Sequence, residues 1–235
     1  MEISLESRLH KRIENSKRSQ EFRFINDENW LPTKVFGNAL DLGCGSGLYT
    51  KLLYEKGIST VAFDIDLKSL KIAKDYVSEN RIKTCCGSGV VLPFKDSVFD
   101  LIVCIEALSH LCHLDHDSVI KECHRVLKKD GVMIISVHNK TRFYFQDISK
   151  LKKPTTVIVN PGLDIYTLSK REFKKALIRV GFELKKDFFF KNYFNSLHNK
   201  YPVIFHFTSK LEDFLSKIPV LNRIGITIIT IVTKK

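Results

Sequence analysis

The chain has 235 residues, of which 44% are hydrophobic and 27% charged, a composition typical of one soluble globular domain with a sizeable core. No apolar run is long enough to span a bilayer, and the charged N-terminus lacks an apolar signal core, so we expect a cytoplasmic protein that is not exported. The formal net charge of +12 favours contact with nucleic acid, anionic lipid or acidic substrates, although a lysine-rich surface explains the charge more simply.

Residues 1–36 precede the regular part of the chain. Ser4 to Arg23 carry a thin apolar stripe at helical spacing, and Pro32 ends regular structure. We therefore expect a helical cap segment over 1–36, followed by a main domain over 37–235.

A glycine-rich turn opens the main domain. Asn38 to Leu42 predict a short buried strand, and Leu48 to Lys56 carry a helical pattern. Between them, Gly43, Gly45 and Gly47 are spaced G-x-G-x-G, unlike the G-x-G-x-x-G of dinucleotide sites. Such a turn presents backbone N–H groups at a helix N-terminus, and a missing β-carbon lets a ligand approach. The simpler alternative is that the glycines only allow a tight turn.

The run from Asp41 to Gly47 closely resembles the first motif of class I S-adenosylmethionine-dependent methyltransferases. This resemblance implies that the turn faces the methionine part of the cofactor and not a pyrophosphate. The cofactor-binding residues that it implies here are Asp41, Gly43, Cys44, Gly45 and Gly47.

A second strand, Thr60 to Phe63, ends at an acidic residue. Asp64 lies about 20 residues beyond the glycine turn, where a carboxylate can accept hydrogen bonds from both hydroxyls of a ribose. Asp66 suits the N-cap of a following helix, Leu67 to Glu79. We therefore assign Asp64 to the ribose and Asp66 to the cap.

A third strand, Arg81 to Cys86, leads into a turn that resembles the adenine-binding turn of the family, including its Leu92-Pro93-Phe94. The family commonly has an aspartate at the position of Ser88, and a serine supplies a shorter, neutral hydrogen-bonding group. Adenine contacts are therefore expected from Ser88 and from the backbone at Gly89 and Val90. The resemblance adds two further cofactor contacts, Ile65 and Ile105.

The segment after a fourth strand, Val98 to Cys104, supplies the candidate catalytic group. Ligands bind beyond the carboxyl ends of strands in such sheets, and His110 lies there with an imidazole that titrates near neutrality. We predict that His110 is a general base, with a surface histidine as the alternative. Position alone makes three weaker candidates: Glu106, Tyr144 and Tyr166.

Cysteine and histidine also gather between residues 110 and 124. No C-x-x-C occurs, and the adjacent pairs Cys112-His113 and Cys123-His124 cannot both point one way on a helix, so we do not expect a structural metal. The six cysteines follow no extracellular spacing, and we expect free thiols.

The rest of the chain alternates helices and strands around two insertions. We expect irregular insertions at about 139–168 and 191–224. The regular elements are predicted at Ser118–Leu127, Val132–Val137, Ser169–Val180, Phe182–Phe190 and Ile226–Val232. The fold class is α/β, and the resemblance implies a doubly wound, Rossmann-like sheet of order 3-2-1-4-5-7-6 with strand 7 antiparallel.

The pattern as a whole resembles the small-molecule group that includes ubiquinone- and menaquinone-type methyltransferases. It implies in-line transfer of a methyl group from S-adenosylmethionine to an O, N or C atom of a small aromatic or apolar acceptor. A tRNA-modifying enzyme and a non-catalytic S-adenosylmethionine-binding protein remain alternatives. Peripheral membrane contact is a third, because aromatic and aliphatic residues alternate with lysines between 205 and 218.

Overall fold

The computed structural model describes residues 37–77, 82–111, 113–140, 156–160, 163–190 and 227–235. Several predictions fall outside these residues. They are the helical cap over 1–36, Tyr144, Cys112, most of the first insertion, and the second insertion with its candidate membrane surface.

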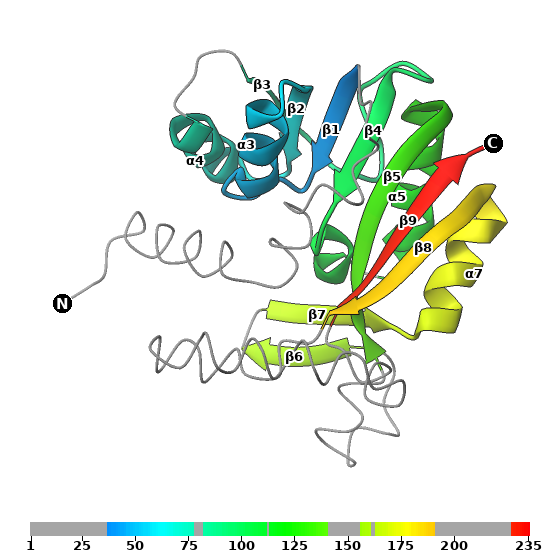
Figure 1. The fold of residues 1–235 in the computed structure, drawn as a ribbon. Coiled ribbons are helices and arrows are strands. Elements are labelled where there is room, and N and C mark those ends of the chain that lie inside the picture. The colour runs from blue at the N-terminus through cyan, green and yellow to red at the C-terminus, as the bar shows by residue number, and fades with distance from the viewer. Residues whose placement is uncertain (1–36, 78–81, 112, 141–155, 161–162, 191–226) are drawn as a thin grey trace, which may run out of the picture.

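The described residues form a twisted sheet with helices on both faces (Figure 1). Its main strands are β1 (Asn38–Leu42), β2 (Ser59–Asp64), β3 (Lys83–Cys86), β4 (Phe99–Cys104), β5 (Leu127–Asn139), β8 (Phe182–Phe190) and β9 (Thr227–Lys234). The first five lie parallel in the order β3-β2-β1-β4-β5, β9 is antiparallel to β5, and β8 is antiparallel to β9. This confirms the expected order 3-2-1-4-5-7-6, with β8 and β9 as strands 6 and 7.

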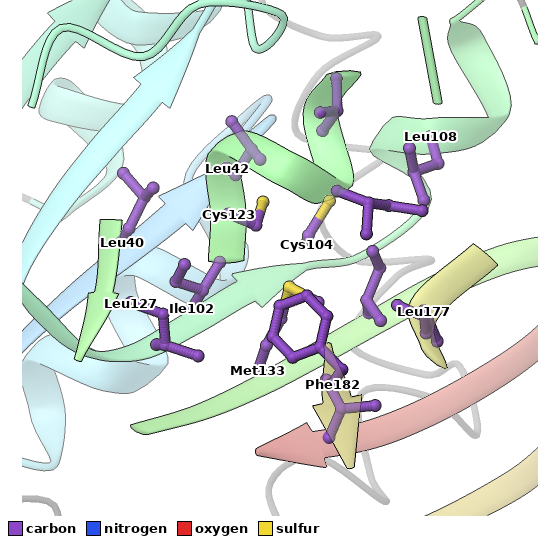
Figure 2. Close-up of a cluster of buried hydrophobic side chains, with 14 of the residues drawn as sticks. Leu40, Leu42, Ile102, Cys104, Leu108, Cys123, Leu127, Met133, Leu177 and Phe182 are labelled. Atoms are coloured by element: carbon purple, nitrogen blue, oxygen red, sulfur yellow. The ribbon is translucent and has the colours of Figure 1, made fainter. Parts of the chain in front are cut away.

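The helices are α3 (Leu48–Glu55), α4 (Leu67–Val77), α5 (His113–Val126) and α7 (Lys170–Val180), with a short 3-10 helix, η1 (Ala107–His110). α5 and α7 share the larger core with one face of the sheet, whereas α3 packs with the other face. Figure 2 shows side chains of β1, β4, β5, α5 and α7 meeting in the larger core, among them Cys104 and Cys123. None of the described helices is both long and apolar enough to cross a bilayer.

Local capping signals set both ends of α7. Ser169 accepts a hydrogen bond from the Glu172 N–H and completes a capping box at the start of α7. Gly181 ends that helix with a φ of 111°, a left-handed conformation that favours glycine. Residues close in sequence therefore set both ends of α7.

The prediction of an irregular first insertion is wrong for residues 156–160 and 163–168. Two strands form there, β6 (Thr156–Asn160) and β7 (Leu163–Leu168), paired as an antiparallel hairpin. The first run, TVIVN, is rich in β-branched residues, which favour a strand, whereas Pro161 and Gly162 in the sequence favour an irregular segment. β7 pairs with the end of β5 and packs against η1, so the hairpin lies at the carboxyl ends of β4 and β5 (Figure 1).

The boundaries of α5 and β5 differ most from the prediction. α5 begins at His113 and not at Ser118, and β5 runs from Leu127 to Asn139 and not only from Val132 to Val137. Long-range pairing accounts for the longer strand, because Phe99 pairs with Leu127 and His138 pairs with both Thr167 and Thr227.

Candidate active site

The glycine turn joins β1 to α3 at the carboxyl edge of the sheet. Gly43, Gly45 and Gly47 have φ angles of 73°, 51° and 82°, all in the left-handed region. A β-carbon at Gly47 would lie 2.7 Å from the Cβ of Ala73 in α4, so that glycine permits close helix packing. A β-carbon at Gly45 would meet nothing within 4 Å. The turn therefore has a closed side at Gly47 and an open side at Gly45.

Most amides of this turn already have protein partners, unlike the expectation from the sequence. The N–H groups of Gly43 and Cys44 donate to the Phe63 carbonyl at 2.8 and 3.0 Å, and the Gly47 N–H donates to the Cys44 carbonyl at 2.9 Å. The turn thus offers a ligand close approach to the backbone at Gly45, and it does not offer a set of unpaired N–H donors at Gly43, Cys44 and Gly47.

Asp64 links the glycine turn to the end of β2. One carboxylate oxygen accepts the Gly45 N–H at 2.9 Å, and the other accepts the Asp66 N–H at 3.0 Å. A carboxylate has about four acceptor positions, so each oxygen can still accept one hydrogen bond. Asp66 accepts the N–H groups of Lys68 and Ser69 at 3.1 and 3.2 Å, which confirms its predicted role as the cap of α4.

Asp41 and Cys44 lie beneath the turn, with only 1% and 6% of their surface exposed. Burial raises the pKa of Asp41 to about 7, although the Thr50 hydroxyl donates to its carboxylate at 2.5 Å. Burial, with the nearby Asp41 charge, also raises the pKa of the Cys44 thiol. These two side chains support the turn from the protein interior.

The predicted adenine turn lies beside Asp64. The Gly87 N–H donates to the Asp64 carbonyl at 3.0 Å, and the Ser88 hydroxyl accepts the Val90 N–H at 3.4 Å. Ile65 is an aliphatic side chain with 72% of its surface exposed. The structure therefore brings Gly45, Asp64, Ile65 and the turn at 88–90 to one edge of the sheet.

The segment after β4 is held by contacts with distant residues. Glu106 has a left-handed φ of 62°, and its N–H donates to the Ser136 hydroxyl at 2.7 Å. The Ser109 hydroxyl accepts the His138 N–H at 3.0 Å. On the other side, His116 Nε2 bonds the carbonyls of Leu108 and Leu111 at 2.8 and 3.0 Å. These contacts fix η1 against β5 and α5.

The remaining predicted residues lie on both sides of η1. His110, at the end of η1, is exposed. Ile105 is buried, with 8% of its surface exposed, in the core that α3 shares with the sheet. Tyr166 is half-buried on β7, which packs against η1. A β-carbon at Gly43 would lie 2.5 Å from the Cβ of Ala107, so the glycine turn also contacts η1.

Sequence reasoning missed Ser109, Ser136 and His138. His138 is half-buried at the end of β5, and burial lowers its pKa to about 4, so its imidazole is neutral at pH 7. No local motif marks these residues, because their partners lie 29 or 30 positions away. Two members of the histidine and cysteine group have structural roles, since His116 holds η1 and Cys123 is fully buried in the core.

Residues 40–135 match a family model described as a methyltransferase domain. Over 142 residues the chain is 36% identical to an uncharacterized protein of Methanocaldococcus jannaschii, covering 57% of this chain and 59% of that protein. Over 103 residues it is 36% identical to a ubiquinone biosynthesis O-methyltransferase of Pelagibacter ubique, covering 43% and 42%. The chain thus spans about half the length of the curated relatives that it matches.

Solved structures share the fold at lower identity. A methyltransferase of Haloferax volcanii, solved with the Trm112 methyltransferase activator, superposes with a TM-score of 0.69 at 17% identity and covers 97% of this chain and 92% of that chain. A SAM-dependent methyltransferase of Methanosarcina mazei gives 0.64 at 18% identity, covering 88% and 95%. The (4+2)-cyclase SpnF gives 0.62 at 18% identity, covering 91% and 80%. These similarities show the fold.

Proposed function

We propose that the chain is a class I S-adenosylmethionine-dependent methyltransferase, which uses S-adenosylmethionine to methylate a small aromatic or apolar molecule; the match of residues 40–135 to a methyltransferase domain supports this. One observation carries the proposal. The Asp64 carboxylate is bonded to the Gly45 N–H at 2.9 Å, so a ribose acceptor stands beside the open side of the glycine turn. The relatives named as O-methyltransferases support a hydroxyl oxygen as the methylated atom.

The residues present fit this cofactor. The space beside Gly45 gives a ligand access to the backbone, and Asp64 keeps one acceptor position on each oxygen for the two hydroxyls of a ribose. Ile65 exposes an apolar side chain next to that carboxylate, as contact with a flat base requires. Asp41 and Cys44, by contrast, contribute through the shape of the turn.

On the acceptor side, the chain's residues position a nucleophile and remove its proton. When bound, the cofactor supplies a methyl group already activated by a sulfonium, so alignment and exclusion of water are the main tasks of the protein. His110 lies on η1 and takes the proton of the acceptor hydroxyl in this proposal. Glu106, the N-cap residue of η1, and Tyr166 on β7 flank the same region and orient the acceptor in this proposal.

The β6–β7 hairpin supports a small acceptor. It lies across the ends of β4 and β5 and packs against η1, so it forms a wall at the edge where the acceptor binds. A wall beside the site favours a small acceptor, because small-molecule sites are concave, whereas a folded RNA needs an open basic face. Small size is therefore the property of the acceptor that the fold supports best.

Binding and methyl transfer must be measured separately, because a protein named as a cyclase shares this fold. S-adenosylhomocysteine at 100 times its Kd should stabilise the protein by about 2.7 kcal/mol in thermal unfolding. With methyl-labelled S-adenosylmethionine, label should enter a hydroxylated aromatic compound that extracts into organic solvent. Label recovered only in RNA would contradict the proposed acceptor, and binding without any transfer would contradict enzymatic activity.

A further inference from the structure

The turn at residues 88–91 is an arch held at its two ends. On one side the Gly87 N–H donates to the Asp64 carbonyl at 3.0 Å. Within the arch, the Val90 N–H donates to the Ser88 hydroxyl at 3.4 Å, and the Val91 N–H donates to the Ser88 carbonyl at 3.2 Å. The position of the arch therefore depends on its anchors.

The second anchor is an ion pair on α5. Glu122 accepts the Leu92 N–H at 2.7 Å, and Arg125 donates to the carbonyls of Leu92 and Phe94 at 2.9 and 2.8 Å. Arg125 also bonds both carboxylate oxygens of Glu122, at 2.7 and 2.8 Å, and Asp96 at 2.7 Å. The planar guanidinium thus joins helix and loop in one fixed geometry.

Both side chains of this pair are partly buried, with 32% of Arg125 and 19% of Glu122 exposed. Hydrogen bonding by Arg125 lowers the pKa of Glu122, so the pair stays ionised at neutral pH. Leu92 is buried, with 3% of its surface exposed, and Phe94 packs edge-on against Phe63 and Phe99. The loop is therefore fixed from residue 92 onward, and the position of residues 88–91 depends on this fixed part of the loop.

We propose that Glu122 and Arg125 are positioning residues for adenine recognition, and that selectivity for adenine here depends on them because position 88 is a serine. A carboxylate at position 88 could hydrogen-bond the adenine amino group directly. The Ser88 hydroxyl is shorter and neutral and already accepts the Val90 N–H, so the backbone groups of the arch carry the larger share of contacts with the edge of the base. Backbone groups can distinguish adenine from other bases only when the position of the arch is fixed. This inference rests on the proposed cofactor.

The test compares binding of S-adenosylhomocysteine and S-inosylhomocysteine, which differ only in the edge of the base. We expect wild type to prefer the adenine compound by about tenfold, as for loss of one or two hydrogen bonds. Arg125→Lys and the isosteric Glu122→Gln should each lower that ratio by about fivefold. Arg179→Lys is the matched control. Arg179 of α7 pairs with Asp117 of α5, the helix that carries Glu122 and Arg125, but this pair lies away from the arch, so the variant should keep the wild-type ratio.

A second-site variant separates positioning from general stability. Ser88→Asp should raise the ratio by about fivefold in wild type and restore it in Arg125→Lys, because it adds a direct acceptor for the amino group. The inference is overturned if folded Glu122→Gln keeps the wild-type ratio, if Ser88→Asp changes nothing, or if wild type binds both compounds equally. Wild type that binds neither compound would overturn the proposed cofactor site itself.

Discussion

The cofactor side of the site, where β1 and β2 end, and the acceptor side, where β4, β5 and β7 end, are fixed by contacts of different range. On the cofactor side, glycines with positive φ turn the chain, and Asp64 reaches Gly45 only 19 positions away. On the acceptor side, Glu106 depends on Ser136, and Ser109 on His138, at separations of 30 and 29. The glycine turn and Asp64 thus depend on short motifs, whereas contacts of about 30 positions hold the acceptor side, as they also hold the end of the adenine turn at Leu92.

Replacing the proposed general base, His110, should give the largest effect, because it should change turnover on the acceptor side and leave cofactor binding unchanged. We expect His110→Gln to lower kcat by about 10²- to 10⁴-fold, the usual contribution of a general base, while the Kd for S-adenosylhomocysteine stays unchanged. His124→Gln is the matched control, because His124 packs on Phe182 away from the site. Wild-type turnover in His110→Gln would make His110 a surface residue, and steady-state kinetics with calorimetry decides between these results.

Two neighbouring glycines test whether the turn has a closed and an open side. Gly47→Ala should destabilise the fold by about 2–4 kcal/mol, since the left-handed backbone is strained and the new β-carbon meets α4. Gly45→Ala should cost about 1–2 kcal/mol from backbone strain alone, and it should weaken S-adenosylhomocysteine binding because its β-carbon enters the ligand's approach. Urea unfolding gives both values, and equal losses of stability would contradict the distinction.

Asp64 and Asp66 allow a matched test of ribose recognition within one loop. Asp64→Asn should weaken S-adenosylhomocysteine binding by about 1–3 kcal/mol, because a charged acceptor is lost. Asp66→Asn should leave that affinity unchanged, since asparagine also caps helices. Calorimetric affinities that fall equally in both variants would remove the assignment of Asp64 to the ribose.

This division explains what the sequence could predict. The turn at Gly43 to Gly47, the cap at Asp66 and the ends of α7 depend on neighbouring residues, so the chemistry of those residues indicated them. The order of the main strands followed from the resemblance. His138, with its lowered pKa, gave no local signal, because its environment is made by β7 and β9 pairing on either side of β5.

Buried acids and bases make the two sides respond to pH with opposite sign. Asp41 has a pKa raised from 3.8 to about 7, so the folded state holds a proton that the unfolded state releases, and this group makes stability fall as pH rises through that range. Asp41→Asn should remove a slope of about 1 kcal/mol per pH unit while keeping an acceptor for Thr50. Urea unfolding at several pH values measures the slope, and an identical slope in the variant would contradict the burial of an ionisable Asp41.

His138 has the opposite effect on the acceptor side. Its pKa is lowered from 6.5 to about 4, so stability that is present above pH 6.5 is lost as pH falls toward 4. His138→Gln should reduce this acid-induced loss of unfolding free energy relative to wild type. The slope that it removes is at most about 1 kcal/mol per pH unit. The same urea series measures it, and a steeper loss in the variant would contradict a buried neutral imidazole.

A crystal structure of the chain with S-adenosylhomocysteine tests the central claim most directly. We predict both ribose hydroxyls on the free acceptor positions of Asp64, the homocysteine part beside Gly45, and the base against Ile65 and residues 88–90. Ribose bound away from Asp64, or a base that leaves Ile65 exposed, would contradict the account.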